Sequence, residues 1–342
     1  MSDSRADSET RSGEAARGGS ILQRGRKVGR DTIKYGAAFA TEDQSMRDES
    51  THAGGKWPLG ILGMGLLSAC TPLHLLNAVV LSHPYHRVRN VAYGPHKRER
   101  LDIYIPKRPS AGPVKVVVFF YGGYWRYGRK RGYKFVGEAL SSRGVIAVVP
   151  NYRLYPSVDW HGFVADGALA YRWVERHITT YGGDPKQVFV MGHSAGAYIA
   201  AMVAFNRPLQ KAMKLKSPPC GFIGLAGPYA FLPITNPKVR QVFASSRHLI
   251  DTQPIHYVSS GDPPTLLLFG RNDHTVNPSN SLQLAAALKA HGDQVRVISY
   301  PDIGHISLLV CLASPFRFLA PTLRDSMAFV RSTTCPTASS LR

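Results

Sequence analysis

Short apolar runs alternate with amphipathic segments along the chain after residue 83. Eight runs rich in β-branched and aromatic residues predict strands, at 88–93, 101–105, 114–120, 145–149, 188–191, 222–225, 265–269 and 295–300. Five segments with helical spacing predict helices, at 133–142, 163–181, 195–206, 279–291 and 322–331. This alternation favours an eight-stranded, mostly parallel sheet with helices on both faces. The polar turn at 94–100 makes the first two strands an antiparallel hairpin at one edge.

The region before the first strand has a different pattern. Residues 1–57 are rich in Ser, Gly, Arg, Asp and Glu and lack apolar periodicity, so we expect them to be disordered. We interpret the first 45 residues as an extension or a mis-assigned start, with Met46 as the alternative beginning. Residues 58–83 are apolar and predict a signal or anchor segment. Residues 84–332 contain neither a repeat nor an internal linker, and residues 84–342 are expected to form one domain.

The apolar segment contains a candidate lipidation site. Residues 67–70 read Leu, Ser, Ala and Cys, which resembles the lipobox of bacterial lipoproteins. The resemblance implies cleavage before Cys70, lipidation of Cys70 and attachment to a membrane of the cell envelope. An uncleaved membrane anchor and an apolar helix packed on the domain stay open, as does a cytoplasmic location. The apolar run before Cys70 is shorter than the ~20 residues that span a bilayer, which favours a signal.

The chain carries a formal net charge of +20. Clustered Lys and Arg would indicate a nucleic-acid partner, but here the basic residues are scattered from Arg5 to Arg342. The densest run, from Arg126 to Arg131, is interrupted by Tyr and Gly. We therefore expect no nucleic-acid partner, but a solvated surface or a weak attraction to anionic lipids.

The four cysteines show neither a CxxC pair nor a spacing with histidines that is typical of metal sites. We therefore expect no metal. Cys220 and Cys311 lie in or beside apolar runs and are expected to be small buried side chains.

The strongest chemical signal is the run from Gly192 to Gly196, with Ser194 at its centre. It follows a predicted strand and precedes a predicted helix. A sharp turn there exposes the serine hydroxyl, and small residues on both sides allow the chain segments to approach closely. We predict Ser194 as a nucleophile, with the amide of Ala195 facing a developing oxyanion.

A nucleophilic serine needs a base that a carboxylate orients. Asp273 follows the predicted strand 265–269, and His305 follows the strand 295–300, so both lie at the carboxyl ends of strands. We predict His305 as the base and Asp273 as its partner. His274 and Asp302 are the nearest rivals, and we interpret them as solvated loop residues.

A third element directly follows the strand 114–120. Gly122, Gly123 and Tyr124 can turn backbone amides toward the site and complete an oxyanion hole. The next residue, Trp125, and Tyr229 in the segment 227–264 could wall a substrate pocket, and packing in the core stays open as the alternative for both. This segment is too short for a large cap, so we expect a small cap or none and an open site.

Together these residues resemble the α/β-hydrolase superfamily, in particular the hormone-sensitive-lipase-like and feruloyl-esterase-like carboxylesterases and kynurenine formamidase. The order Ser194, Asp273, His305 is that of the family, and residues 151–156 (NYRLYP) are similar to its DYRLAPE loop. Tyr121 replaces the usual His of the oxyanion loop, and Tyr124 replaces its third Gly.

The resemblance implies an α/β-hydrolase fold, with 84–342 as the catalytic domain. It implies hydrolysis of small or medium carboxylic esters through an acyl-enzyme, without a metal or organic cofactor. The expected partner is therefore a small-molecule ester. Two alternatives stay open: an arylformamidase, and a catalytically silent homologue that binds a ligand or a partner.

Overall fold

The computed structural model describes residues 76–77, 85–107 and 112–335. Their strands are β1 (Tyr85–Ala92), β2 (Arg100–Pro106), β3 (Val114–Phe120), β4 (Ile146–Pro150), β5 (Gly183–His193), β6 (Gly221–Leu225), β7 (Thr265–Gly270) and β8 (Val295–Tyr300). The α-helices are α2 (Lys134–Ser141), α3 (Trp160–His177), α4 (Ala195–Phe205), α5 (Arg207–Ala212), α6 (Pro237–Val242), α7 (Ser279–Ala290), α8 (His305–Val310) and α9 (Thr322–Ser332).

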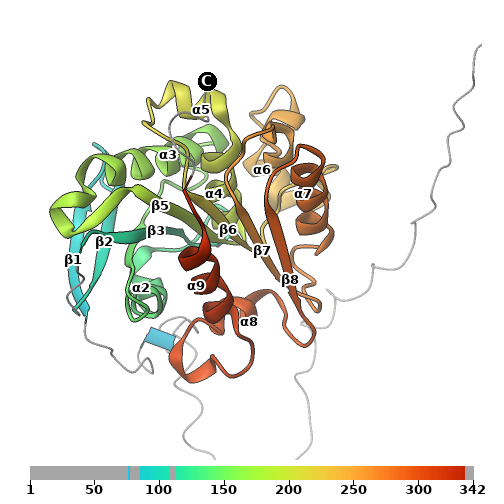
Figure 1. Ribbon diagram of the computed structural model, residues 1–342. Coiled ribbons are helices and arrows are strands. Elements are labelled where there is room, and N and C mark those ends of the chain that lie inside the picture. Colours follow the sequence, from blue (N-terminus) through green and yellow to red (C-terminus); the bar gives the residue numbers. More distant parts are fainter. Residues whose placement is uncertain (1–75, 78–84, 108–111, 336–342) are drawn as a thin grey trace, which may run out of the picture. The chain divides into compact units, whose positions relative to one another are not determined.

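The strands form one sheet in the order β1-β2-β4-β3-β5-β6-β7-β8. The pairs from β4 to β8 are parallel, whereas β1 and β2 are antiparallel to each other and β2 is antiparallel to β4. Helices α2 and α9 cover one face, and α3, α4 and α7 cover the other (Figure 1). The predicted α/β-hydrolase fold, with its hairpin at one edge, is confirmed.

The central strands are continuous apolar runs because helices cover both of their faces. Every residue of β4, β6 and β7 is buried, and so is every residue of α4. This burial fixes the position of the turn that joins β5 to α4. Since parallel strands end at the same edge, the loops after β5, β7 and β8 meet there.

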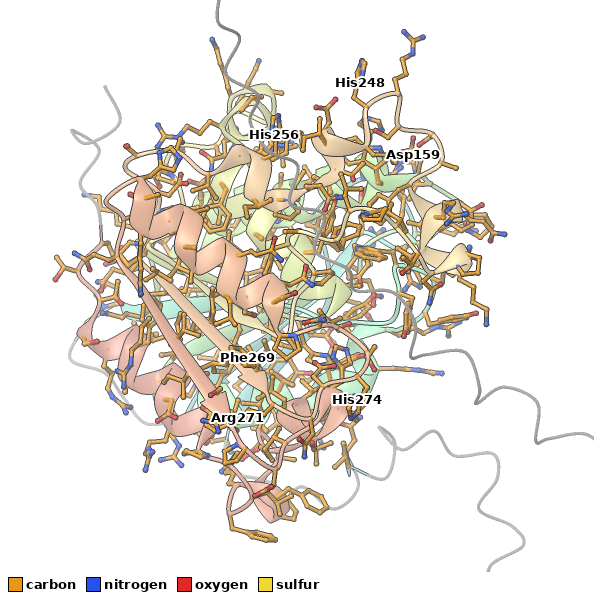
Figure 2. The ribbon with its side chains drawn as sticks, turned by 90° about the vertical axis from the view of Figure 1, so that its right-hand side faces the viewer. Asp159, His248, His256, Phe269, Arg271 and His274 are labelled. Atoms are coloured by element: carbon orange, nitrogen blue, oxygen red, sulfur yellow. A yellow bond between two sulfur atoms is a disulfide. The ribbon has the colours of Figure 1, made fainter. Side chains whose placement is uncertain are left out.

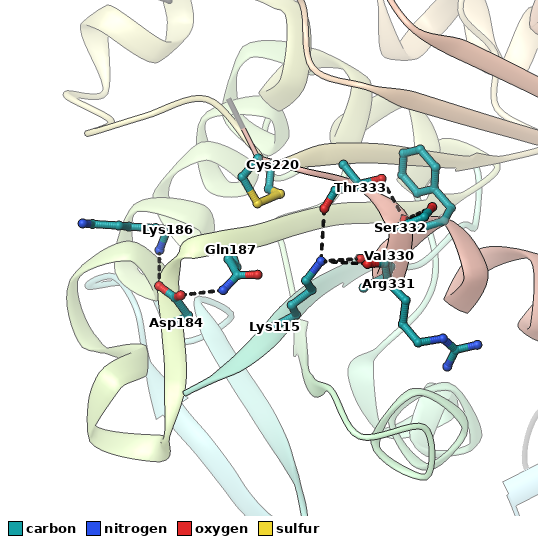
Figure 3. Close-up of a disulfide and its surroundings, with 11 residues drawn as sticks. Lys115, Asp184, Lys186, Gln187, Cys220, Val330, Arg331, Ser332 and Thr333 are labelled. Carbon is teal, nitrogen blue, oxygen red and sulfur yellow. Dashed lines mark hydrogen bonds between the residues drawn. A yellow bond between two sulfur atoms is a disulfide. The ribbon is translucent and has the colours of Figure 1, made fainter. Parts of the chain in front are cut away.

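A disulfide holds the C-terminal end of the described chain. Cys220 and Cys335 are 115 residues apart in sequence and form an S–S bond (Figure 3). Cys220 and Cys311 are both buried, as expected, but Cys220 is part of this disulfide, whereas Cys311 is a free thiol. Beside this bond, the Lys115 ammonium donates hydrogen bonds to the carbonyls of Val330 (2.8 Å) and Thr333 (3.1 Å). The two features tie the end of α9 to the sheet.

The predicted lipidation site Cys70 and residues 1–75 lie outside the described residues. Two residues of the apolar segment are described. Leu76 is buried, and the Asn77 amide donates hydrogen bonds to the carbonyls of Arg131 and Gly132, each 3.0 Å long. Within the described ranges, no helix has the length and hydropathy needed to cross a bilayer.

The segment between β6 and β7 carries only the short helix α6 and two single-turn 3-10 helices, Leu249–Thr252 and Pro254–Tyr257. Arg126, from the loop after β3, fixes α6 through hydrogen bonds to the Lys238 carbonyl (3.1 Å) and the Gln241 side chain (2.6 Å). The prediction of a small cap is confirmed.

Candidate active site

Ser194 lies on the turn between β5 and α4 and has a strained backbone, with φ 55° and ψ −127°. The flanking glycines make this turn possible. A Cβ on Gly196 would lie 2.1 Å from the Phe120 carbonyl oxygen, and one on Gly192 would lie 2.3 Å from the Gly196 oxygen. The Ser194 amide donates to the Leu225 carbonyl (2.9 Å), which fixes the turn to β6. The strain is thus held by contacts on both sides, as is typical of functional turns.

Asp273 and His305 are joined directly. The Nδ1 atom of His305 lies 2.8 Å from Oδ2 of Asp273, and both side chains are almost fully buried. The other oxygen, Oδ1, accepts hydrogen bonds from the amides of Thr275 and Val276, each 2.9 Å long. Burial alone would raise the pKa of Asp273, but the hydrogen bonds from His305 and the two amides outweigh it, and the pKa lies below its ordinary value.

This bond sets the chemistry of the imidazole. A charged carboxylate accepts the Nδ1 proton of His305, so Nε2 is left free to act as a base. In the described part of the chain, the Ser194 hydroxyl makes no hydrogen bond to His305. Such contacts are commonly long before substrate binds.

Main-chain contacts bring the two loops together. The Asn272 amide donates to the Ile303 carbonyl (3.1 Å), and a Cβ on Gly270 would lie only 1.9 Å from that oxygen. The rival residues His274 and Asp302 are exposed, as expected for solvated loop residues. Figure 2 labels Arg271 and His274, which both belong to the loop that follows β7.

A further residue of the site, His193, was missed by the sequence analysis. Its Nε2 lies 2.9 Å from the main-chain oxygen of His305, and its ring lies 4.7 Å from the His305 ring. Burial beside His305 lowers the pKa of His193 to about 3, so its ring is neutral. The sequence did contain an indication of this role, because His193 directly precedes Ser194 and a side chain at that position lies next to the predicted base.

The loop after β3 presents free amides. Gly123, Tyr124 and Trp125 have positive φ angles of 124°, 53° and 57°. Among the described residues, the amides of Gly123, Tyr124 and Ala195 donate no hydrogen bond. The Cβ position of Gly122 lies 3.0 Å from the Ser194 Cβ, so this loop runs against the strained turn. Free amides beside a nucleophile are the arrangement of an oxyanion hole.

Tyr121, which replaces the usual His, fixes this loop by packing and hydrogen bonds. Its ring is fully buried and stacks on Tyr133 and Tyr152, with centroids 5.0 and 4.7 Å apart. Its hydroxyl accepts from Arg98 (3.1 Å) and donates to the Asn151 side chain (3.2 Å). The Tyr152 hydroxyl donates to the Tyr121 carbonyl (2.6 Å). An aromatic stack therefore supports the loop here.

The NYRLYP segment is held by an ion pair. The Arg153 guanidinium binds the buried Asp166 of α3, with Nη2 and Oδ1 2.6 Å apart, and the Arg153 amide donates to the same carboxylate (2.6 Å). This pair fixes the loop after β4 to the helix that follows it.

A cavity of about 420 Å³ adjoins Ser194. Its apolar wall includes Trp125, Phe231, Leu232 and Ile234, and its polar side includes Asn277. The prediction for Trp125 agrees with this lining, and half-exposed Tyr124 lies at the cavity surface.

Tyr229 does not line this cavity. Its ring is fully buried and packs edge-on against Phe222, with centroids 5.9 Å apart. It lies against Gly224 and Gly227, where only the absence of a Cβ leaves room for it. The pocket role expected for Tyr229 is therefore wrong, because its side chain turns into the core.

Two family models match the chain. The BD-FAE model matches residues 101–219, and the prolyl oligopeptidase family model matches residues 170–310. The two matches overlap and together extend from β2 to α8.

Curated relatives include a probable isoprenylcysteine alpha-carbonyl methylesterase of Arabidopsis thaliana, 31% identical over 68% of this chain and 53% of the relative. Esterase LipQ of Mycobacterium tuberculosis is 29% identical over 71% of this chain and 63% of the relative. The chain thus spans less than two thirds of the length of these relatives.

Solved structures of esterases are similar to the fold. Inhibited esterase B from Lactobacillus rhamnosis gives a TM-score of 0.68 at 18% identity, covering 76% of this chain and 91% of that chain. Apo esterase 2 of Thermogutta terrifontis gives 0.61 at 22% identity, covering 72% and 96%.

Proposed function

We propose that this chain, which belongs to the α/β-hydrolase superfamily, hydrolyses carboxylic esters with small or medium acyl groups. The observation that carries the proposal is the hydrogen bond between Asp273 and His305, at the sheet edge where Ser194 lies on its strained turn. A silent homologue would have no need to keep a charged, buried carboxylate on this imidazole.

The proposed reaction has two steps. Nε2 of His305 takes the proton of the Ser194 hydroxyl while Oγ bonds to the substrate carbonyl carbon, and the carbonyl electrons move to oxygen. The amides of Tyr124 and Ala195, with Gly123 or Gly122, stabilise this oxyanion. His305 then protonates the leaving alcohol, and an acyl-Ser194 ester remains. Water repeats the sequence and releases the acid.

The cavity supports the size of substrate. About 420 Å³ lies within the usual range for small-molecule sites and accommodates a short or medium acyl group. Its apolar wall suits the acyl chain, and its polar side near Asn277 suits the more polar part of the ester.

The test is hydrolysis of aryl acetate, butyrate, octanoate and dodecanoate esters by the full-length protein. An N-formyl aromatic amide tests the formamidase alternative, and an S-prenylcysteine methyl ester tests the activity in the name of the plant relatives. Ser194→Ala is expected to abolish turnover and fluorophosphonate labelling. Ser279→Ala removes another serine from the same cavity and is expected to change neither. Turnover that survives Ser194→Ala, or no turnover of any acyl substrate, would overturn the proposal.

We also propose that the protein is exported and anchored through a lipidated Cys70. The lipobox-like residues before Cys70 support this, and so does the Cys220–Cys335 bond, because disulfides persist in oxidising compartments. Mass spectrometry of the mature N-terminus after membrane fractionation tests it. A soluble protein with unmodified Cys70 and an intact upstream sequence would contradict it.

A further inference from the structure

A second cavity, of about 300 Å³, lies between the β1–β2 hairpin and the segment that follows the oxyanion loop. Seven of its nine lining residues are Lys or Arg, and the other two are Asn90 and Asn151. Acidic residues are absent from its described lining. A concave surface with charges of one sign concentrates the field and attracts anions. We call this cavity the basic pocket.

Two of the seven cations are built into the fold. Arg87 and Lys130 both bind the fully buried carboxylate of Asp102, each with a nitrogen 2.6 Å from an oxygen. The Asn90 amide donates to the same carboxylate (2.9 Å), and the Asn90 side chain accepts from Lys130 (2.6 Å). One carboxylate therefore holds two cations in fixed positions and neutralises only one charge.

The other five cations are not neutralised within the described residues. They are Arg89, Lys97, Arg100, Arg129 and Arg131, and none of them forms an ion pair there. Arg100 is half-buried, and its guanidinium donates to the carbonyls of Gly94, His96 and Glu99 at 2.9–3.2 Å. These carbonyls fix the position of the guanidinium without cancelling its charge.

Part of the lining of the basic pocket lies at the carboxyl end of β4, on the edge of the sheet where Ser194 follows β5. Leu101 of β2 pairs with Pro150 at the carboxyl end of β4, and β2 is three strands from β5. Asn151 links the two sites, since its side-chain oxygen accepts from the Lys130 amide (2.7 Å) and from the Tyr121 hydroxyl (3.2 Å). A ligand in the pocket would thus contact the residue that supports the oxyanion loop.

We propose that the basic pocket binds a phosphate monoester group, carried either by an anionic phospholipid or by a soluble phosphate. A phosphate monoester carries close to two negative charges at neutral pH and offers several acceptor oxygens. Guanidinium groups match that geometry with paired hydrogen bonds. The cations around this small cavity carry more charge than a ligand with a single carboxylate would need. The cavity is also too small to enclose a folded macromolecule.

The experiment uses the full-length protein and two probes. Binding of glycerol 3-phosphate, measured by calorimetry, tests whether the ligand is a soluble phosphate. Vesicles of phosphatidylcholine with or without phosphatidic acid, followed by co-sedimentation, test a lipid source. The variant is Arg89→Gln with Arg131→Gln, which removes two exposed charges from the pocket. The matched control, Arg143→Gln with Arg176→Gln, removes two exposed charges at the opposite edge of the sheet.

We expect the pocket variant to weaken binding at least tenfold and the control to stay within about twofold of wild type. Loss of glycerol 3-phosphate binding identifies a soluble ligand, and loss of binding to phosphatidic acid vesicles alone identifies a lipid. If wild type binds neither probe, or if both variants lose binding equally, the proposal is overturned. Ester hydrolysis by both variants should match wild type in the absence of probe, so failure of this proposal is separate from failure of the esterase proposal.

Discussion

The Nε2 atom of His193 lies 2.9 Å from the main-chain oxygen of His305, and the two imidazole rings are 4.7 Å apart. A carbonyl oxygen only accepts, so Nε2 of His193 carries the proton. The residue directly before the proposed nucleophile therefore holds the main chain of the proposed base. We assign His193 a positioning role, because it binds His305 and not the reacting atoms.

Replacing His193 with Leu removes this hydrogen bond to the main chain of His305. The lost hydrogen bond is worth about 1–2 kcal/mol. If the transition state loses this stabilisation and the ground state does not, kcat decreases roughly tenfold. We expect KM to change little and His193→Gln, which keeps a donor, to recover part of the rate. Active-site titration with a fluorophosphonate normalises the rates. Equal kcat per labelled site in the Leu variant and wild type would contradict the positioning role.

Asp273 and Asp302 offer a matched pair of substitutions. Asp273→Asn removes the charge that stabilises the imidazolium and permits the wrong tautomer, and we expect kcat to fall by roughly 10²–10⁴. Asp302 is exposed, and Asp302→Asn should leave kcat within about twofold. Steady-state kinetics on one aryl ester measures both. Similar losses in the two variants would refute the assignment of the acid.

The strands were predictable where their apolar runs are long. The predicted bounds of β3 and β8 agree with the structure, because both are dense in β-branched residues. β5 begins at Gly183, five residues before its predicted start, because Gly183 pairs with Val114 of β3. The polar stretch 184–187 has no strand periodicity and lies in the register shift before Val188. Helices α5, α6 and α8 have six residues each, too few for a helical pattern to show.

The predicted site depended on motifs, and motifs do not report packing. The glycines around Ser194 and the chain order of Asp273 and His305 were visible in the sequence. The pairing of Cys220 with Cys335 was not, because 115 residues separate them and only the fold brings the two thiols together. Tyr229 was misplaced for a related reason, since an aromatic residue after a strand turns equally well to a pocket or to the core.

Tyr121→Phe keeps the aromatic stack and removes both hydrogen bonds of the hydroxyl. We expect unfolding to become easier by about 1 kcal/mol and kcat to fall roughly three- to tenfold, because the oxyanion loop loses its link to Asn151. Tyr133→Phe is the control, since Tyr133 stacks on Tyr121 and makes no side-chain hydrogen bond to a described residue. Chemical denaturation and steady-state kinetics measure the two effects. A larger loss of kcat in the control would contradict this account.

Breaking the disulfide should destabilise the domain. The bond closes a loop of 115 residues, and constraining the unfolded chain to this extent stabilises by roughly 2–5 kcal/mol. We expect Cys335→Ser to lower Tm by about 5–15 °C. Wild type in a reducing agent should show the same loss, and the variant should not respond to the agent. Cys311→Ala, at the free cysteine, is expected to stay sensitive to reduction. A wild-type Tm that is insensitive to full reduction would contradict the role of the bond.

Asp262 makes stability depend on pH. Burial is the main cause that raises the pKa of its carboxyl to about 7, and the charge of Asp293 adds to it. The folded pKa is above the ordinary value of the unfolded chain, so protonation of Asp262 stabilises the fold below about pH 4. That stabilisation is lost as the pH rises through about 7. Asp262→Asn should remove this loss and be more stable than wild type at alkaline pH by about 1–3 kcal/mol, partly offset by the broken ion pair with Arg207 (3.6 Å).

Denaturation of Asp262→Asn and wild type between pH 4 and 9 measures this dependence, with the exposed Asp302→Asn as control. We expect the difference in unfolding free energy between Asp262→Asn and wild type to grow with pH and to be smallest near pH 4, because the folded wild type already carries a neutral carboxyl there. The control should follow wild type at every pH. A difference that stays constant, or that grows toward acid, would mean that Asp262 is charged in the fold. The ion pair with Arg207 would then outweigh burial.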